Sequence, residues 1–93
     1  MIFEWDEKKN QANRKKNGIW FEEAKSVFED SVAIVFKDDA HSEEEERFLI
    51  IGNNAFGSNL LVVHCFRKNA ETIRIISARK TTKREKMFYE KRI

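Results

Sequence analysis

The stretch NLLVVHCFRKNAETIRIISAR, residues 59–79, decides the fold because it has the pattern of two strands joined by a tight reversal. Residues 59–67 and 72–79 are rich in Val, Ile and Leu, and the KNAE between them has the composition and length of a turn. A link this short makes the two strands antiparallel neighbours. Upstream, two more strands are predicted at residues 32–37 and 47–52. GNNAFGSN has the composition of a hairpin loop between the strand at 47–52 and the strand at 59–67. The sequence therefore predicts a four-stranded antiparallel meander.

An unusually polar helix is predicted before the sheet. Asp6 is a suitable N-cap, and Gly18 suits the left-handed position that closes a helix. Between them Ala12 is the only apolar residue, so this helix has no broad apolar face. Three polar residues share one side of it: Lys9, Asn13 and Lys16. Such a side either faces solvent or is directed at a charged ligand.

Two further helices complete the predicted architecture. A second helix over residues 21–28 is indicated by apolar residues at helical spacing, which are Phe21, Ala24, Val27 and Phe28. TKRE at residues 82–85 fits a capping box, so a C-terminal helix should begin at Thr82 and run through Tyr89. The fold class is therefore α+β, with two N-terminal helices, a meander sheet and a C-terminal helix, all helices on one side of the sheet. A chain of 93 residues leaves room for one domain, 1–93.

The composition is that of a folded domain with a charged exterior, since 41% of the residues are hydrophobic and 37% are charged. No apolar run approaches the roughly 20 residues needed to cross a bilayer, and the first residues lack signal-peptide features. We therefore expect a cytoplasmic protein without membrane contact.

The one cysteine, Cys65, lies in an apolar run and is expected to be a buried, unreactive thiol.

The charge is concentrated at the C-terminal end. Residues 79–93 hold seven basic and two acidic side chains and carry +5, whereas the other 78 residues carry −3. This separation suggests a nucleic acid or an acidic partner. A helix that is merely well solvated explains the same charge.

Four stretches of the chain resemble the BrnT family of bacterial type II toxins: FEWD at 3–6, GIWFEEAKSVFED at 18–30, DAHSEEEERF at 39–48 and RIISARKTTKRE at 74–85. The resemblance implies a RelE-like fold and a ribonuclease that acts on RNA without the ribosome. We expect no cofactor. It also implies a BrnA-like antitoxin partner that carries a DNA-binding domain, so that the toxin would meet DNA only indirectly, through the antitoxin.

The chain departs from this family at several positions. Asn17 stands where the family commonly has His, Trp20 stands where Ser or Asp is common, and the chain has no proline. If the usual His takes part in chemistry, Asn17 cannot replace it as a proton carrier. If that His only closes the first helix, Asn is a good substitute.

Metal-free RNA cleavage needs a group that removes the 2′-OH proton, a proton for the leaving oxygen, and cations that stabilise the phosphorane. RelE-like nucleases resemble one another in their reliance on Arg and Lys for the last of these. Strict alternation places Ser77 and Arg79 on one face with Ile73 and Ile75, and places Arg67 and Arg79 at opposite ends of their hairpin. The candidate catalytic residues are Arg79, Arg67, His64, His41 and Arg47.

The two histidines are the natural proton carriers near neutral pH, but each has a structural alternative. His64 lies in LLVVHCF, where a core histidine is common. His41 lies in an acidic loop and can pair with Glu45 or Asp39. The loop sequence DDAHSEEEE has no recognised metal-ligand spacing, so no metal is expected.

The residues expected to bind RNA are Lys9, Asn13, Lys16, Lys80, Lys83, Arg84 and Tyr89. The lysines and Arg84 would hold phosphates without reading bases, and Tyr89 would either stack a base or pack in the core.

Two other function classes stay open at this point. One is a non-catalytic module that binds nucleic acid or a protein partner, and the other is a transcription factor, for which no recognition helix is visible.

Overall fold

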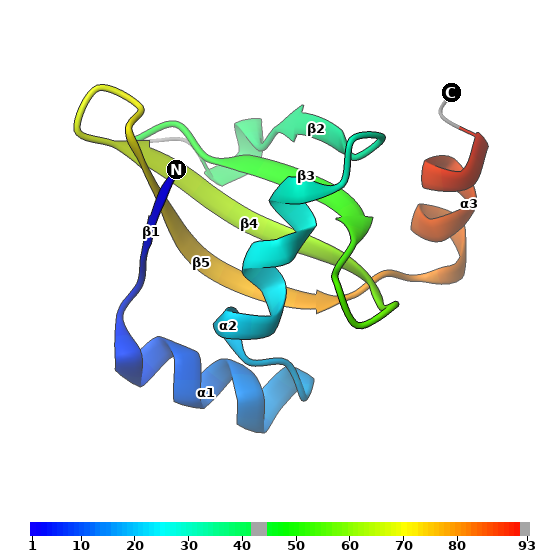
Figure 1. The fold of residues 1–93 in the computed structure, drawn as a ribbon, viewed down its shortest axis with the longest axis horizontal. Helices are drawn as coiled ribbons and strands as arrows, with labels where there is room; N and C mark the ends of the chain where they lie inside the picture. Colours follow the sequence, from blue (N-terminus) through cyan, green and yellow to red (C-terminus); the bar gives the residue numbers. More distant parts are fainter. Residues whose placement is uncertain (42–44, 92–93) are drawn as a thin grey trace.

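The computed structural model describes residues 1–41 and 45–91, in which a five-stranded mixed sheet carries helices on both faces (Figure 1). In chain order the elements are β1 (Ile2–Glu4), α1 (Glu7–Asn17), α2 (Phe21–Ala24), the 3-10 helix η1 (Lys25–Glu29), β2 (Ile34–Lys37), the 3-10 helix η2 (Asp39–His41), β3 (Phe48–Asn53), β4 (Asn59–Arg67), β5 (Thr72–Lys80) and α3 (Lys83–Lys91).

The sheet has the strand order β1-β5-β4-β3-β2. The four predicted strands are present as the antiparallel meander β2 to β5. The prediction of a purely antiparallel sheet of four strands is wrong because β1 pairs in parallel with the first residues of β5. A strand of three residues shows too little alternation to be recognised in the sequence.

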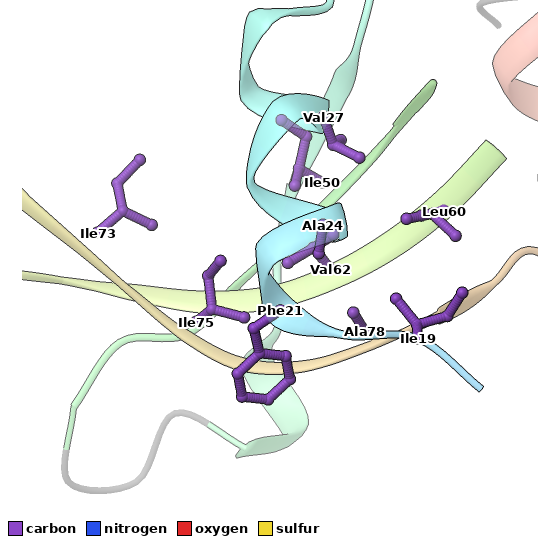
Figure 2. Packing of buried hydrophobic residues seen from close by; sticks show 10 residues of the cluster. All are labelled: Ile19, Phe21, Ala24, Val27, Ile50, Leu60, Val62, Ile73, Ile75 and Ala78. Carbon is purple, nitrogen blue, oxygen red and sulfur yellow. The ribbon is translucent and has the colours of Figure 1, made fainter. Parts of the chain in front are cut away.

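The main core lies between the sheet and the segment formed by α2 and η1 (Figure 2). In the second N-terminal helix only the first turn is α-helical, and η1 continues it, so the predicted regular helix over residues 21–28 is wrong in detail. Three residues of its predicted apolar stripe, Phe21, Ala24 and Val27, are nevertheless fully inaccessible, and the fourth, Phe28, is partly buried. These side chains face Ile50, Leu60, Val62, Ile73, Ile75 and Ala78 of the sheet.

A smaller apolar cluster covers part of the opposite face, where Ile51 and Leu61 pack with Tyr89 of α3. The expectation that all helices lie on one side is therefore wrong. The predicted capping box of α3 is confirmed, since the Thr82 amide donates to Glu85 Oε1 at 2.8 Å and the Glu85 amide donates to Thr82 Oγ1 at 3.2 Å. The Tyr89 hydroxyl donates to Asp30 Oδ2 at 2.6 Å and ties α3 to the segment that precedes β2.

Helix α1 is attached to the sheet by buried amides rather than by an apolar face. Its predicted ends are confirmed, because Asp6 accepts from the amides of Lys8 and Lys9 and Gly18 closes the helix at φ 76°. Asn13 is buried and bonds both backbone groups of Ala78, donating to its carbonyl at 2.8 Å and accepting from its amide at 3.1 Å. The Asn13 side chain thus does for the edge of β5 what a neighbouring strand does in a sheet.

A β-bulge in β5 decides which side chains face which side of the sheet. Val63 pairs with Ser77 and His64 pairs with Ile75, so Ile76 is an extra residue without a partner on β4. The bulge turns Ala78 into the main core with Ile73 and Ile75. The predicted grouping of Ser77 and Arg79 with these isoleucines is wrong, because both side chains line the opposite face.

Candidate active site

An open pocket of about 400 Å³ lies on the sheet face opposite α2, beside α3. Its floor is formed by strand side chains that alternate with those of the main core, and its charged groups come from η2 and the residue before it, the loop before β3, β5 and α3. The lining residues are Asp38, His41, Arg47, Leu49, Leu61, Val63, Ile76, Ser77, Arg79 and Glu85. Three of the five predicted catalytic residues, His41, Arg47 and Arg79, therefore share one concavity.

Arg79 is held by Glu85 in a bidentate pair on the wall of the pocket. Nη1 lies 2.8 Å from Glu85 Oε1 and Nη2 lies 2.9 Å from Oε2, and Nη1 also donates to the Lys80 carbonyl. The hydrogen bonds from Arg79 lower the pKa of Glu85 below its ordinary value, so the carboxylate stays ionised. The geometry fixes the guanidinium between β5 and α3.

His41 forms a dyad with Asp38 at the mouth of the pocket. Its Nδ1 lies 3.1 Å from Asp38 Oδ2, with 69% of the His41 side chain exposed and only 14% of the Asp38 side chain. The pairing expected with Glu45 or Asp39 is wrong, because the turn of η2 brings residue 38 under the ring. In the neutral ring this contact places the proton on Nδ1, and Nε2 is then the basic nitrogen.

The other two predicted catalytic residues lie away from the pocket. Arg67 is at the far end of β4, paired with Thr72 in the sheet, and its guanidinium lies 3.2 Å from Glu45. The expected separation of Arg67 from Arg79 is confirmed. His64 is 1% exposed, and burial lowers its pKa. Its ring packs among Phe28, Phe48 and Phe66, so it is a core histidine.

The predicted RNA-binding residues separate into buried and exposed groups. Asn13 and Tyr89 are buried and engaged with Ala78 and Asp30. Lys9 and Lys16 line a second, smaller hollow beside α1. Lys80, Lys83 and Arg84 are exposed where β5 ends and α3 begins.

Two charged groups of the pocket were not among the predicted site residues. Asp38 is recognisable only from its position three residues before His41, which a short helical turn converts into a contact. Glu85 was expected as a helix cap, and it serves both as that cap and as the partner of Arg79. Neither residue type marks a site by itself, because both are common on the surface of this chain.

In residues 1–41 and 45–91 no group of three or more His, Cys, Asp and Glu side chains is arranged to hold a metal ion. Ser42, Glu43 and Glu44 of the acidic loop lie outside the described residues. The same described part of the chain contains no helix of the length and apolarity that a membrane span requires.

Comparison with known proteins identifies the family. Residues 5–85 match the family model described as the ribonuclease toxin, BrnT, of type II toxin-antitoxin systems. The crystal structure of the Brucella abortus ribonuclease toxin BrnT is similar, with a TM-score of 0.68 and 24% identity over 89% of this chain and all of that one, and this likeness shows a shared fold. A comparison with curated proteins gives no match. The chain belongs to the BrnT family of type II ribonuclease toxins.

Proposed function

We propose that this protein is a ribosome-independent endoribonuclease and that the pocket containing His41, Arg47 and Arg79 is its active site. The observation that carries the proposal is the convergence of an imidazole and two guanidinium groups, from three separate parts of the chain, on one concavity. The family supplies the substrate class, RNA. The groups present suit a reaction without a metal, in which positioned cations stabilise the transition state.

The chemistry begins at the ribose. Nε2 of His41 accepts the proton of the 2′-OH, and the oxygen attacks the adjacent phosphorus while Asp38 stabilises the imidazolium that forms. Arg79 and Arg47 stabilise the charge on the phosphorane oxygens. The bond from phosphorus to the 5′ oxygen then breaks, and that oxygen takes a proton from solvent at the open mouth of the pocket. The products are a 2′,3′-cyclic phosphate and a 5′-OH end.

Glu85 leaves Arg79 able to bind a phosphate. A guanidinium has five N–H donors, and among the described residues three of those of Arg79 are used, two by Glu85 and one by the Lys80 carbonyl. Nε–H and the second N–H of Nη2 remain, and together they form the side-on fork that matches two phosphate oxygens. The Glu85 pair therefore orients Arg79 towards a ligand.

The proposed partner, besides RNA, is a BrnA-like antitoxin in the same cytoplasm. Lys80, Lys83 and Arg84 form an exposed basic edge next to the pocket, and within residues 1–41 and 45–91 none of them makes an ion pair. This edge suits the RNA backbone on the free toxin and acidic side chains of an antitoxin in the complex. DNA would be contacted through the antitoxin alone.

Purified protein incubated with a defined RNA in EDTA tests this function. We expect cleavage with 2′,3′-cyclic phosphate ends, and no cleavage at a nucleotide that carries 2′-deoxyribose. The variant Arg67→Gln serves as a charge control outside the pocket. RNA that stays intact at micromolar protein, with correctly folded toxin, would support a non-catalytic binding module instead.

A further inference from the structure

A second hollow of about 190 Å³ lies between α1 and the edge of β5, and we call it the α1 groove. It shares Ile76 and Ser77 with the active-site pocket, so the two hollows meet at the bulge. Its lining residues are Lys9, Ala12, Asn13, Lys16, Asn17, Ile76 and Ser77. Strand β1 pairs with β5 only as far as Arg74, which leaves the edge beyond it to α1.

The α1 groove differs from the pocket in its charge. The groove is lined by two lysines and by no carboxylate, whereas the pocket is lined by two arginines and two carboxylates. Lys9 and Lys16 are both exposed, and within the described part of the chain neither forms an ion pair. An uncompensated positive charge beside a charge-balanced site attracts a polyanion that extends beyond the site.

The groove is also held in a fixed position relative to the pocket. Asn13 binds Ala78 on β5, and Asn17 Nδ2 donates to Asn13 Oδ1 at 3.0 Å and to the Ala78 carbonyl at 3.1 Å. Ala78 follows Ser77, which lines both hollows. The amides therefore fix the two lysine-bearing turns of α1 beside the bulge, and they account for Asn17 as a structural residue.

We propose that the α1 groove is a subsite for the phosphate next to the scissile one in a single-stranded RNA, so that the RNA backbone crosses β5 at Ile76 and Ser77. This inference rests on the proposed function for the meaning of "scissile". Lys9 and Lys16 hold the flanking phosphate electrostatically and read no base. The groove supplies affinity, and the pocket supplies the chemical step.

The test compares two double variants of the same helix. Lys9→Gln/Lys16→Gln removes the groove charges, and Lys8→Gln/Lys15→Gln removes two exposed charges at the same spacing that do not line the groove. Binding of a 2′-O-methyl RNA oligomer, which cannot be cleaved through its 2′ position, is measured over a series of salt concentrations. We expect the groove variant to lose several-fold more affinity than the control and its salt slope to fall by about 0.7, the value for one phosphate contact in a single strand.

Shortening the oligomer sharpens the result. Removing nucleotides from one side of the scissile position should abolish the difference between the two variants, and removing them from the other side should preserve it. Equal losses in both variants, or a difference that survives shortening from either side, would overturn the inference. Thermal unfolding confirms that each variant is folded. If the unmodified protein binds RNA through the groove but cleaves nothing, the proposed function fails and the inference that the groove flanks a scissile phosphate falls with it, while cleavage without a difference between the two variants overturns the inference alone.

Discussion

The proposed active-site pocket and the α1 groove adjoin each other at one bulge, yet their charges are arranged differently. In the pocket the cation of Arg79 is held by Glu85 and the imidazole of His41 by Asp38, so two of the three proposed reacting groups are oriented by a carboxylate. In the groove the lysines have no acidic partner among the described residues. An ion pair fixes the orientation of its side chains but weakens their net attraction for a phosphate. An unpaired lysine attracts a phosphate without a fixed orientation. The two proposals together therefore assign chemistry to the pocket and affinity to the groove.

The largest effect is expected from the proton carrier of the pocket. His41→Gln should lower kcat by about 100-fold or more, since general acid–base catalysis contributes about 10²–10⁴-fold. Because the ring is exposed and outside the core, the free energy of unfolding should stay close to that of the natural protein. Single-turnover cleavage of a short RNA and thermal unfolding measure the two quantities. A kcat within threefold of the natural protein would remove His41 from the mechanism.

The second-largest effect on kcat is expected from loss of the Arg79 guanidinium. Arg79→Gln should lower kcat by about 10²–10³-fold, the usual effect of removing one electrostatic donor to a transition state. Arg67→Gln, which removes the same charge at the far end of β4, should leave kcat unchanged because its side chain is outside the pocket. The comparison is made from kcat values at saturating RNA. Equal losses for the two variants would mean that net charge, not the geometry of the pocket, governs the rate.

Removing the buried amide of Asn13, which joins α1 to β5, should lower the stability of the fold. Asn13→Ala leaves the amide of Ala78 and the carbonyl of Ile19 without their buried partner, which should cost about 2–3 kcal/mol of unfolding free energy. Gln11→Ala, at an exposed position of the same helix, is the matched control and should cost little. Urea denaturation measures both. A cost for Asn13→Ala no larger than that of the control would show that α1 does not depend on its buried amides.

The buried histidine outside both hollows gives the smallest effect and separates stability from activity. Burial lowers the pKa of His64, so the unfolded state takes up a proton more readily than the folded state. The stabilisation by the neutral ring is therefore fully present above its ordinary pKa of about 6.5 and is lost as the pH falls below it. His64→Phe should flatten the decline of melting temperature between pH 7 and pH 5. An unchanged decline would assign that pH dependence to other groups.

Local signals in the sequence predict local structure well in this protein. The caps at Asp6, Gly18 and Thr82 and the hairpin strands are all where the sequence places them, because each depends on residues within a few positions of one another. The bulge at Ile76 is not visible in this way. It exists because unbroken alternation would bury Arg79 on the face of the main core, and that constraint belongs to the packed sheet.

The candidate site was predictable in residue type but not in arrangement. His41, Arg47 and Arg79 were expected from their chemistry, and their meeting in one pocket depends on η2, the bulge and α3 together. Asn13 was expected on an RNA-binding side and is instead a buried partner of β5, since the helix has no apolar face with which to attach itself. Tertiary contacts between distant residues carry this information.

The division between the two hollows is tested most directly by kcat and KM for two variants on one RNA, His41→Gln in the pocket and Lys9→Gln/Lys16→Gln in the groove. The account predicts that the pocket variant loses kcat with little change in KM, and that the groove variant raises KM with kcat retained. A groove variant that loses kcat as strongly as the pocket variant, or a pocket variant that changes KM alone, would contradict it.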